Sequence, residues 1–173
     1  MQHTVYIALG ANLGDRYGIL KQAVAHLPPP VLPRASSPVY QTAPWGFSDQ
    51  PDYLNQVIEA GTDLEPLELL RYLKALEIRL GREPTFRYGP RKIDLDILFY
   101  DDLILDTPEL AIPHPRLHVR DFVLVPLADL APDLVHPGLG CTVAELLARA
   151  PRGRIEIYSD PAGDPTHRSD IFG

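Results

Sequence analysis

The chain has 173 residues, of which 45% are hydrophobic and 23% are charged, so it is long enough to form one domain with a substantial core. Its 16 Lys and Arg residues and 23 Asp and Glu residues give a net charge of −7, which argues against a nucleic-acid-binding or membrane-surface protein. A single cysteine, Cys141, excludes an internal disulfide and a cysteine-ligated metal cluster. Since the sequence has no signal-peptide pattern and no run of about 18 apolar residues, we expect a soluble, cytoplasmic protein.

Apolar spacing and turn residues predict an alternation of strands and helices. In chain order we expect a strand at 4–9, a helix at 15–27, strands at 37–42 and 54–61, a helix at 66–80, a strand at 93–100, a short helix or turn at 122–126 and a helix at 142–150. The order β-α-β-β-α-β is that of the split βαβ motif. We therefore predict an α+β fold with a ferredoxin-like βαββαβ core, in which helices lie on an antiparallel sheet, followed by a C-terminal extension.

The last residues of the chain differ from the rest. Residues 161–173 carry no periodic apolar residues, which predicts a disordered tail, and we expect residues 1–160 to form a single domain. Because the ferredoxin-like topology serves RNA-binding modules, metallochaperones and enzymes alike, the function has to be predicted from individual residues.

Two aspartates stand two residues apart in the last predicted strand. Because strand side chains alternate between faces, Asp94 and Asp96 should project from one face, where their charges repel unless a cation joins them. Mg²⁺ binds one or two carboxylates together with phosphate oxygens, and Arg82, Arg87 and Arg91 lie just upstream. The combination favours a site for a metal–nucleotide complex. The alternative is an edge strand that uses its charges to avoid aggregation.

A second basic group follows at His114, Arg116 and Arg120. Prolines on both sides of His114 restrict its backbone, so this side chain should be held in one place. The group either adds to the phosphate-binding arginines or forms a surface turn that pairs with the excess acidic residues.

Aromatic residues gather in the loop between the second and third predicted strands. Trp45, Phe47 and Tyr53, with Thr42 and Asn55 nearby, indicate a flat heterocycle held by stacking, whose edge an amide and a hydroxyl recognise. Alternatively, these aromatic side chains only anchor the loop to the core.

The turn after the first strand, Gly10-Ala-Asn-Leu-Gly-Asp15, superficially suggests a phosphate-binding loop. It is not a Walker loop, because the Gly-Lys-Ser/Thr ending is absent. Asn12 and Asp15 are equally well explained as turn and helix-cap residues.

Taken together, these segments resemble the 6-hydroxymethyl-7,8-dihydropterin pyrophosphokinase family of folate biosynthesis, over about residues 4–150. The resemblance rests on residues 6–15 (YIALGANLGD), 42–46 (TAPWG), 49–55 (DQPDYLN), 87–98 (RYGPRKIDLDIL) and 112–116 (IPHPR). It implies transfer of the terminal diphosphate of MgATP to the hydroxymethyl group of the pterin, with release of AMP. It also implies a ferredoxin-like α+β fold with three mobile loops.

The resemblance implies a role for each matching residue. Asp94 and Asp96 match the two aspartates that hold two Mg²⁺ ions against the triphosphate of the co-substrate ATP. With Arg82 and Arg91, they are the predicted catalytic residues. The predicted ATP-binding residues are Glu77, Arg82, Arg91, Ile97, His114, Arg116 and Arg120. The predicted pterin-binding residues are Gly10, Thr42, Ala43, Trp45, Tyr53, Asn55 and Phe122.

Four positions depart from the pattern of the family. Ala43 replaces a usual proline, and Lys74 stands where a glutamine often contacts ATP. Pro84 stands where a second arginine is common in the lid, and Tyr88 where tryptophan is common. These differences concern affinity and loop motion rather than the metal ligands.

We expect a monomer whose partners are the small molecules ATP and 6-hydroxymethyl-7,8-dihydropterin, with no nucleic acid and no membrane. Two other functions remain open: a non-catalytic ferredoxin-like nucleotide- or RNA-binding module, and an ordinary ATP kinase that releases ADP. An RNA-binding sheet should interleave basic residues with exposed aromatics, whereas Asp94 and Asp96 repel phosphate unless a metal intervenes.

Overall fold

The computed structural model of the chain describes residues 1–46 and 48–159. Phe47 of the predicted aromatic group and the predicted tail, residues 161–173, lie outside the described residues. In the part that the structure describes, no helix is long and apolar enough to cross a membrane.

The main sheet has six strands in the order β5-β1-β4-β3-β8, and β2 pairs with the second half of β4. All of these strand pairs are antiparallel. The elements, in chain order, are β1 (His3–Ala11), α1 (Arg16–Ala25), β2 (Val31–Ser36), β3 (Tyr40–Thr42), β4 (Tyr53–Thr62), α2 (Pro66–Arg79), β5 (Asp94–Tyr100), β6 (Leu105–Asp106), β7 (Ala111–Ile112), the 3₁₀ helix η1 (Leu117–Val119), α3 (Asp121–Leu130), α4 (Val143–Arg149) and β8 (Ile155–Ile157). This architecture confirms the predicted α+β fold with a ferredoxin-like core.

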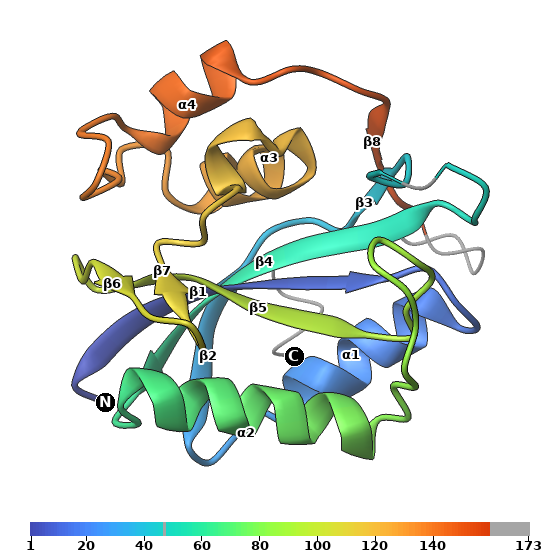
Figure 1. The fold of residues 1–173 in the computed structure, drawn as a ribbon, viewed down its shortest axis with the longest axis horizontal. Coiled ribbons are helices and arrows are strands. Elements are labelled where there is room, and N and C mark those ends of the chain that lie inside the picture. The colour runs from blue at the N-terminus through green and yellow to red at the C-terminus, as the bar shows by residue number, and fades with distance from the viewer. Residues whose placement is uncertain (47, 160–173) are drawn as a thin grey trace.

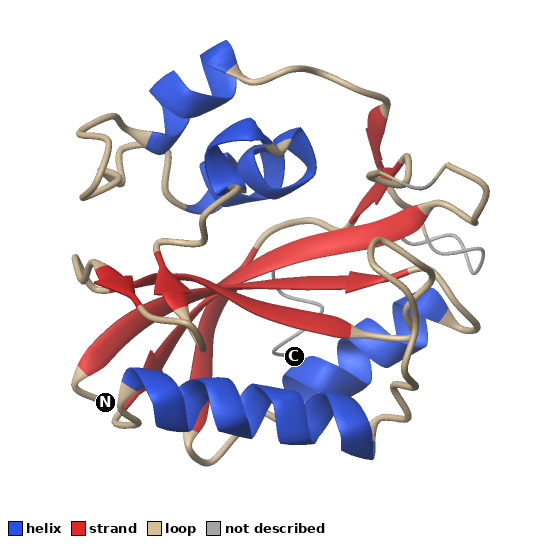
Figure 2. Cartoon of the chain, in the orientation of Figure 1, coloured by secondary structure: helices blue, strands red, loops and turns tan. Residues whose placement is uncertain are grey.

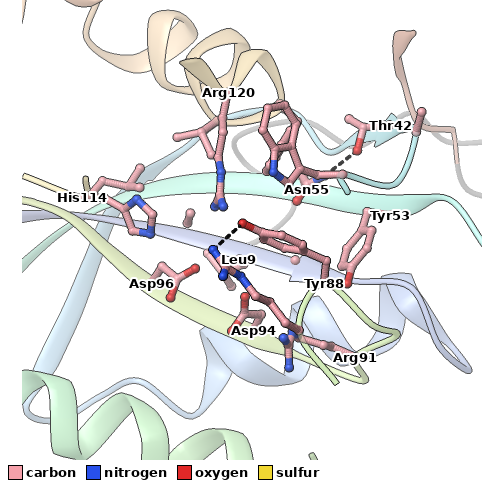
Figure 3. Close-up of a pocket in the computed structure, with 18 residues that line it drawn as sticks. Leu9, Thr42, Tyr53, Asn55, Tyr88, Arg91, Asp94, Asp96, His114 and Arg120 are labelled. Carbon is pink, nitrogen blue, oxygen red and sulfur yellow. Dashed lines mark hydrogen bonds between the residues drawn. The ribbon is translucent and has the colours of Figure 1, made fainter. Parts of the chain in front are cut away.

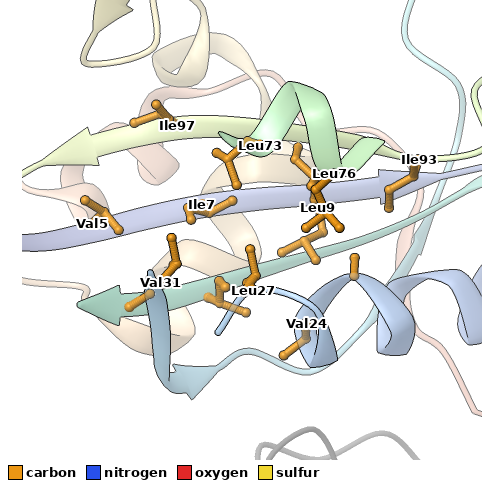
Figure 4. Close-up of a cluster of buried hydrophobic side chains, with 14 of the residues drawn as sticks. Val5, Ile7, Leu9, Val24, Leu27, Val31, Leu73, Leu76, Ile93 and Ile97 are labelled. Atoms are coloured by element: carbon orange, nitrogen blue, oxygen red, sulfur yellow. The ribbon is translucent and has the colours of Figure 1, made fainter. Parts of the chain in front are cut away.

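The helices lie in two layers, one on each side of the sheet. Helices α1 and α2 cover one face, and α3 and α4 lie over the opposite face (Figure 1, Figure 2). Val5, Ile7 and Leu9 of β1 pack toward α1 and α2 in the larger apolar core, which Figure 4 shows. A second core joins the other face to α3, through residues that include Val57 and Leu124. The sheet is therefore buried on both faces over much of its area.

Local sequence explains where the first two helices begin. The carboxylate of Asp15 accepts a hydrogen bond from the Gly18 N–H (3.1 Å), so Asp15 is the N-cap of α1. Pro66 occupies the first turn of α2, and Glu65 and Glu68 form a capping box around it.

Toward the end of β1, after Tyr6, the face that looks toward α3 carries very small side chains. In the register of the sheet, Gly10 lies opposite Asn55 of β4 on one side and Asp94 of β5 on the other. Two residues earlier, Ala8 lies between Val57 and Asp96 in the same way. A strand with small residues between two strands with larger ones leaves a hollow, and this hollow is where the functional site lies.

The structure corrects the strand prediction between α1 and β4. Residues 37–39 of the predicted strand 37–42 are not in a strand, and β2 forms instead at Val31–Ser36. The sequence did not indicate β2 because Pro33 lies within it, and proline is tolerated only in edge strands or at irregularities. The structure shows such an irregularity, since the pairing of β2 with β4 shifts between Pro33 and Ala35. Helix α3 also runs further than the short helix or turn that we predicted from residue 122.

Candidate active site

A cavity of about 200 Å³ opens over the small residues of β1 on the α3 side of the sheet. Strands β4 and β5 form its floor with β1, and the start of α3 forms one wall. Three segments complete it: the aromatic loop (residues 43–46 and 48–52), the lid (residues 82–91) and the segment between β7 and α3 (residues 113–120). Figure 3 shows side chains from all of these segments pointing into the same space.

One side of the cavity is built from uncharged side chains, which we call the neutral end: Thr42, Ala43, Trp45, Tyr53, Asn55 and Phe122. The Asn55 amide donates a hydrogen bond to the Thr42 hydroxyl (2.6 Å), and both side chains are buried. The Trp45 and Phe122 ring centroids lie 5.9 Å apart with their planes tilted by 54°. The Tyr53 hydroxyl donates to the Gly89 carbonyl in the lid (3.1 Å). The neutral end thus offers aromatic surfaces beside a fixed amide.

The other side carries ionisable groups, and we call it the charged end: Arg91, Asp94, Asp96, His114 and Arg120. As predicted from strand alternation, Asp94 and Asp96 both line the cavity, whereas Leu95 between them faces the α1 and α2 layer. Burial and the neighbouring charge of Asp96 raise the pKa of the Asp94 carboxyl, while nearby cations oppose that rise. A cation next to the pair therefore stabilises the charged forms of both carboxyl groups.

Cations from outside the cavity hold Asp94 in place. The Arg82 guanidinium donates to Asp94 (3.1 Å) and is also paired with Glu77. Burial disfavours the ammonium charge of Lys74, but Asp96, Asp94 and Glu77 outweigh burial and raise its pKa. Lys74 is thus a cation beside the same carboxylates.

His114 is neutral at ordinary pH because of its surroundings. Burial, followed by the positive charge of Arg120, lowers the pKa of His114 to about 4. Its Nδ1 accepts a hydrogen bond from the Arg116 backbone N–H (3.2 Å), so the proton of the neutral ring lies on Nε2. His114 can therefore donate one hydrogen bond without adding charge.

Arg120 reaches between the two ends of the cavity (Figure 3). Its guanidinium carbon lies 5.6 Å from the ring centroids of both Trp45 and Phe122. Its Nε is buried and has no hydrogen-bond partner in residues 1–46 and 48–159. A buried donor without a partner indicates a place for a ligand acceptor.

Asn12 joins the loops that enclose the cavity. Its side-chain amide donates to Gln50 (2.8 Å) and to the Pro51 carbonyl (3.0 Å), and its oxygen accepts from the Arg91 backbone N–H (2.8 Å). Gln50 in turn donates to the Tyr88 carbonyl (2.7 Å). From the sequence, Asn12 is equally consistent with a phosphate-binding loop and with a turn. Its partners lie 38 to 79 residues away, so no local pattern could have identified this role.

Two glycines leave room for these contacts. A Cβ on Gly10 would stand 2.9 Å from the Asn55 side-chain oxygen, so the cavity floor requires glycine there. Gly46 has a φ of +81°, and a Cβ on it would stand 2.6 Å from the Tyr88 ring. The aromatic loop and the lid can approach this closely only because residue 46 has no side chain.

The cavity brings together most of the predicted site residues but not all of them. The predicted residues that line it are Gly10, Thr42, Ala43, Trp45, Tyr53, Asn55, Arg91, Asp94, Asp96, His114, Arg120 and Phe122. Four lie outside its lining: Glu77, Arg82, Ile97 and Arg116. Ile97 is buried in the larger core, and Arg116 lies over the Tyr88 ring at 5.5 Å. A nucleotide-binding role for these four stays a prediction.

Two carboxylates suit a metal ion whose other ligands come from water and a bound phosphate. In the described part of the chain, no three His, Cys, Asp or Glu side chains are grouped to hold a metal ion. Asp94 and Asp96 supply two carboxylates. This matches Mg²⁺, which usually takes one or two carboxylates and completes its shell with water and phosphate oxygens.

Comparison with known proteins gives one consistent family. The family model for 7,8-dihydro-6-hydroxymethylpterin-pyrophosphokinase (HPPK) matches residues 6–132. The 2-amino-4-hydroxy-6-hydroxymethyldihydropteridine pyrophosphokinase of Pseudomonas aeruginosa is 45% identical over 159 residues, which cover 90% of this chain and 97% of that protein. The protein of the same name from Aquifex aeolicus is 42% identical, over 78% of this chain and 84% of that protein.

Longer proteins share the same region. The folic acid synthesis protein FOL1 of Dictyostelium discoideum is 40% identical over 86% of this chain, but the match spans only 23% of FOL1. A crystal structure of Plasmodium falciparum HPPK-DHPS with pteroate has a TM-score of 0.69 at 18% identity, covering 85% of this chain and 42% of that one, which supports the fold. The motifs, the fold and these matches agree, and the chain belongs to the 7,8-dihydro-6-hydroxymethylpterin-pyrophosphokinase family.

Proposed function

We propose that this cavity transfers the terminal diphosphate of ATP to the hydroxymethyl group of 6-hydroxymethyl-7,8-dihydropterin, with release of AMP. As a member of its family, the chain is an ATP-dependent pyrophosphokinase of folate biosynthesis. The observation that carries the proposal for this site is that one cavity joins a neutral end to a charged end. A flat heterocycle and a triphosphate need those two environments side by side.

The neutral end suits the pterin. Trp45, Tyr53 and Phe122 supply aromatic surface for stacking. Because the Asn55 amide is already bonded to Thr42, its remaining acceptor and donor are held in a fixed direction and can recognise the polar edge of the ring. Gly10 and Ala43 complete the proposed pterin site by adding little bulk.

The charged end suits the triphosphate. Arg91 and Arg120 supply positive charge, and His114 supplies a neutral N–H donor. Arg82 holds Asp94 from outside the cavity, so we propose a positioning role for it. Arg116, which lies over the Tyr88 ring, and Glu77, which pairs with Arg82, are proposed to border the nucleotide. For Ile97 the support is the sequence motif alone.

Asp94 and Asp96 are the residues that would hold Mg²⁺, and we propose two ions, as the resemblance to the family implies. When bound, the ions neutralise charge on the phosphate oxygens and make the transferred phosphorus more electrophilic. The chain contributes mainly by positioning both substrates and by excluding water. Gln50 of the aromatic loop and Tyr53 at the start of β4 both donate hydrogen bonds to the lid, at Tyr88 and Gly89, and we propose that these contacts close the cavity.

The product nucleotide tests this proposal. The protein is incubated with MgATP and the reduced hydroxymethylpterin, and the nucleotides are separated by chromatography. AMP that forms only when the pterin is present supports the proposal. ADP would indicate an ordinary kinase, and no turnover would indicate a binding module; either result overturns it. Nothing in the structure or the comparisons favours these alternatives. The monomeric state and cytoplasmic location stay predictions.

A further inference from the structure

Two side chains of α2 satisfy the backbone of Leu95 at the free edge of β5. Strand β5 is the outer strand of the sheet, so Leu95 has backbone groups that point away from β1. The Leu95 N–H donates to the Glu77 carboxylate (2.7 Å), and the Leu95 carbonyl accepts from the Lys74 ammonium (3.1 Å). These contacts fix the position of Lys74 at the edge of the sheet.

From this edge Lys74 reaches the carboxylates on the cavity side of β5. Its Nζ lies 3.7 Å from an oxygen of Asp96, 4.0 Å from an oxygen of Asp94 and 3.1 Å from Glu77. Arg82, by contrast, pairs with Asp94 and Glu77. Among the described residues, Lys74 is the one cation within ion-pair distance of Asp96.

The charges in this group do not balance. Within ion-pair distance, Glu77, Asp94 and Asp96 are opposed by Lys74 and Arg82, which leaves a net charge of −1 before the more distant charges of Arg91 and Arg120 are counted. Without Lys74 the net charge would be −2, and a divalent cation would meet no ammonium beside Asp96. Opposed charges at about 4 Å in a partly buried site interact strongly, so this ammonium competes directly with a metal ion.

We propose that Lys74 is the counter-ion of the Asp94–Asp96 pair when no ligand is bound. Its charge makes the pair bind a divalent metal in complex with a nucleoside triphosphate in preference to the metal alone. The inference rests on the proposed metal role of the two aspartates. A bare metal ion is repelled by the ammonium, which is held in place by Leu95 and Glu77. A metal–triphosphate complex carries negative phosphate oxygens that attract the same ammonium. Lys74 is thus a positioning residue that couples metal binding to nucleotide binding.

Two binding measurements with opposite expected signs test this role. In the first, Mn²⁺ alone is titrated into the protein and followed by electron paramagnetic resonance. Lys74→Gln should bind Mn²⁺ at least about tenfold more tightly than the wild type, because one repelling charge is gone. In the second, calorimetry measures the Mg²⁺ complex of α,β-methylene-ATP, and Lys74→Gln should bind it at least about threefold more weakly. A merely structural loss would weaken both ligands.

Two further variants separate charge from shape. Lys74→Arg keeps the charge and should bind both ligands like the wild type. Lys92→Gln removes an exposed lysine of the segment before β5 and should change the Mn²⁺ affinity less than about twofold, because its charge is screened by solvent. Melting curves confirm that each variant is folded.

Failure of the proposed role of Lys74 can be distinguished from failure of the proposed metal binding by Asp94 and Asp96. If Mn²⁺ binds Lys74→Gln no more tightly than the wild type, or binds neither protein, the proposed role of Lys74 is wrong. A variant Asp96→Asn should lose affinity for the metal–nucleotide complex. If Asp96→Asn binds that complex unchanged, the metal assignment itself is wrong and the inference falls with it.

Discussion

The neutral and charged ends of the cavity are held together in different ways. At the neutral end, side chains bond to one another or to the backbone, as Asn55 does to Thr42 and Tyr53 does to Gly89. At the charged end, Asp94 and Asp96 depend on cations that reach them from α2 and from the lid. The neutral end is thus complete without a ligand, whereas the charged end keeps a buried Arg120 donor that has no partner among the described residues and that a ligand can satisfy.

The two ends meet over the small residues of β1. Gly10 lies between Asn55 and Asp94 in the register of the sheet, so the two ends meet across one glycine. If the ends are independent, damage to one should leave the binding function of the other intact. The following variants test that independence, beginning with the largest expected effect.

Removing a carboxylate of the charged end should have the largest effect. Asp94→Ala and Asp96→Ala should each lower turnover by at least about 100-fold, because the metal and triphosphate charges lose their compensation. The rate of AMP formation measures this, and circular dichroism checks the fold. Pterin affinity should change less than about threefold. A comparable loss of pterin affinity would show that the ends are not independent.

Removing Asn12 should loosen the loops over both ends. Asn12→Ala deprives Gln50, the Pro51 carbonyl and the Arg91 N–H of buried partners, and should lower the free energy of unfolding by about 2 to 3 kcal/mol. Chemical denaturation measures the loss. Asn12→Asp keeps the acceptor for Arg91 but places a buried carboxylate against the oxygens of Gln50 and Pro51, so it should lose at least as much stability as the alanine variant. A clearly smaller loss in Asn12→Asp would contradict the importance of the two bonds that the amide donates.

His114 should make the protein less stable in mild acid. Its pKa of about 4 in the folded state lies below the ordinary value near 6.5, so only the unfolded chain takes up this proton between those values. Stability should therefore fall as the pH drops, by about 2 kcal/mol from this residue between pH 7 and pH 5. His114→Gln should remove that part of the loss in denaturation experiments, whereas His26→Gln, at an exposed position, should not.

Truncating an aromatic of the neutral end should weaken only the pterin. Phe122→Ala should reduce pterin affinity by about 5- to 150-fold, or about 1 to 3 kcal/mol, through lost stacking. Calorimetry with the pterin and with an ATP analogue measures both ligands on one variant. If both affinities fall equally, Phe122 supports the core rather than the pterin.

Adding a charge to the lid should have the smallest effect. Pro84 is exposed and does not line the cavity, so an arginine there would be largely screened by solvent. Pro84→Arg should tighten MgATP binding by no more than about threefold and slightly lower the melting temperature, because proline stiffens the loop. Tightening beyond tenfold would mean that the lid brings residue 84 onto the phosphates.

Short-range patterns were enough for much of this molecule. Period-two alternation placed Asp94 and Asp96 on one face of β5, and helical spacing predicted α1 and α2 close to their observed ends. The motifs also identified most of the residues that line the cavity. Patterns of this kind work because they reflect the geometry of a single strand or helix, which neighbouring residues determine.

Contacts between distant segments depend on the tertiary fold. The sequence does not show that Gly10 separates Asn55 from Asp94, because strand register depends on pairing across the whole sheet. Nor does it show that Lys74 lies beside Asp96, since a helix on one face reaches the other only around the edge of the sheet. These contacts follow from how the sheet and the helices pack. Packing depends on many residues that are far apart in the sequence, so no local pattern predicts it.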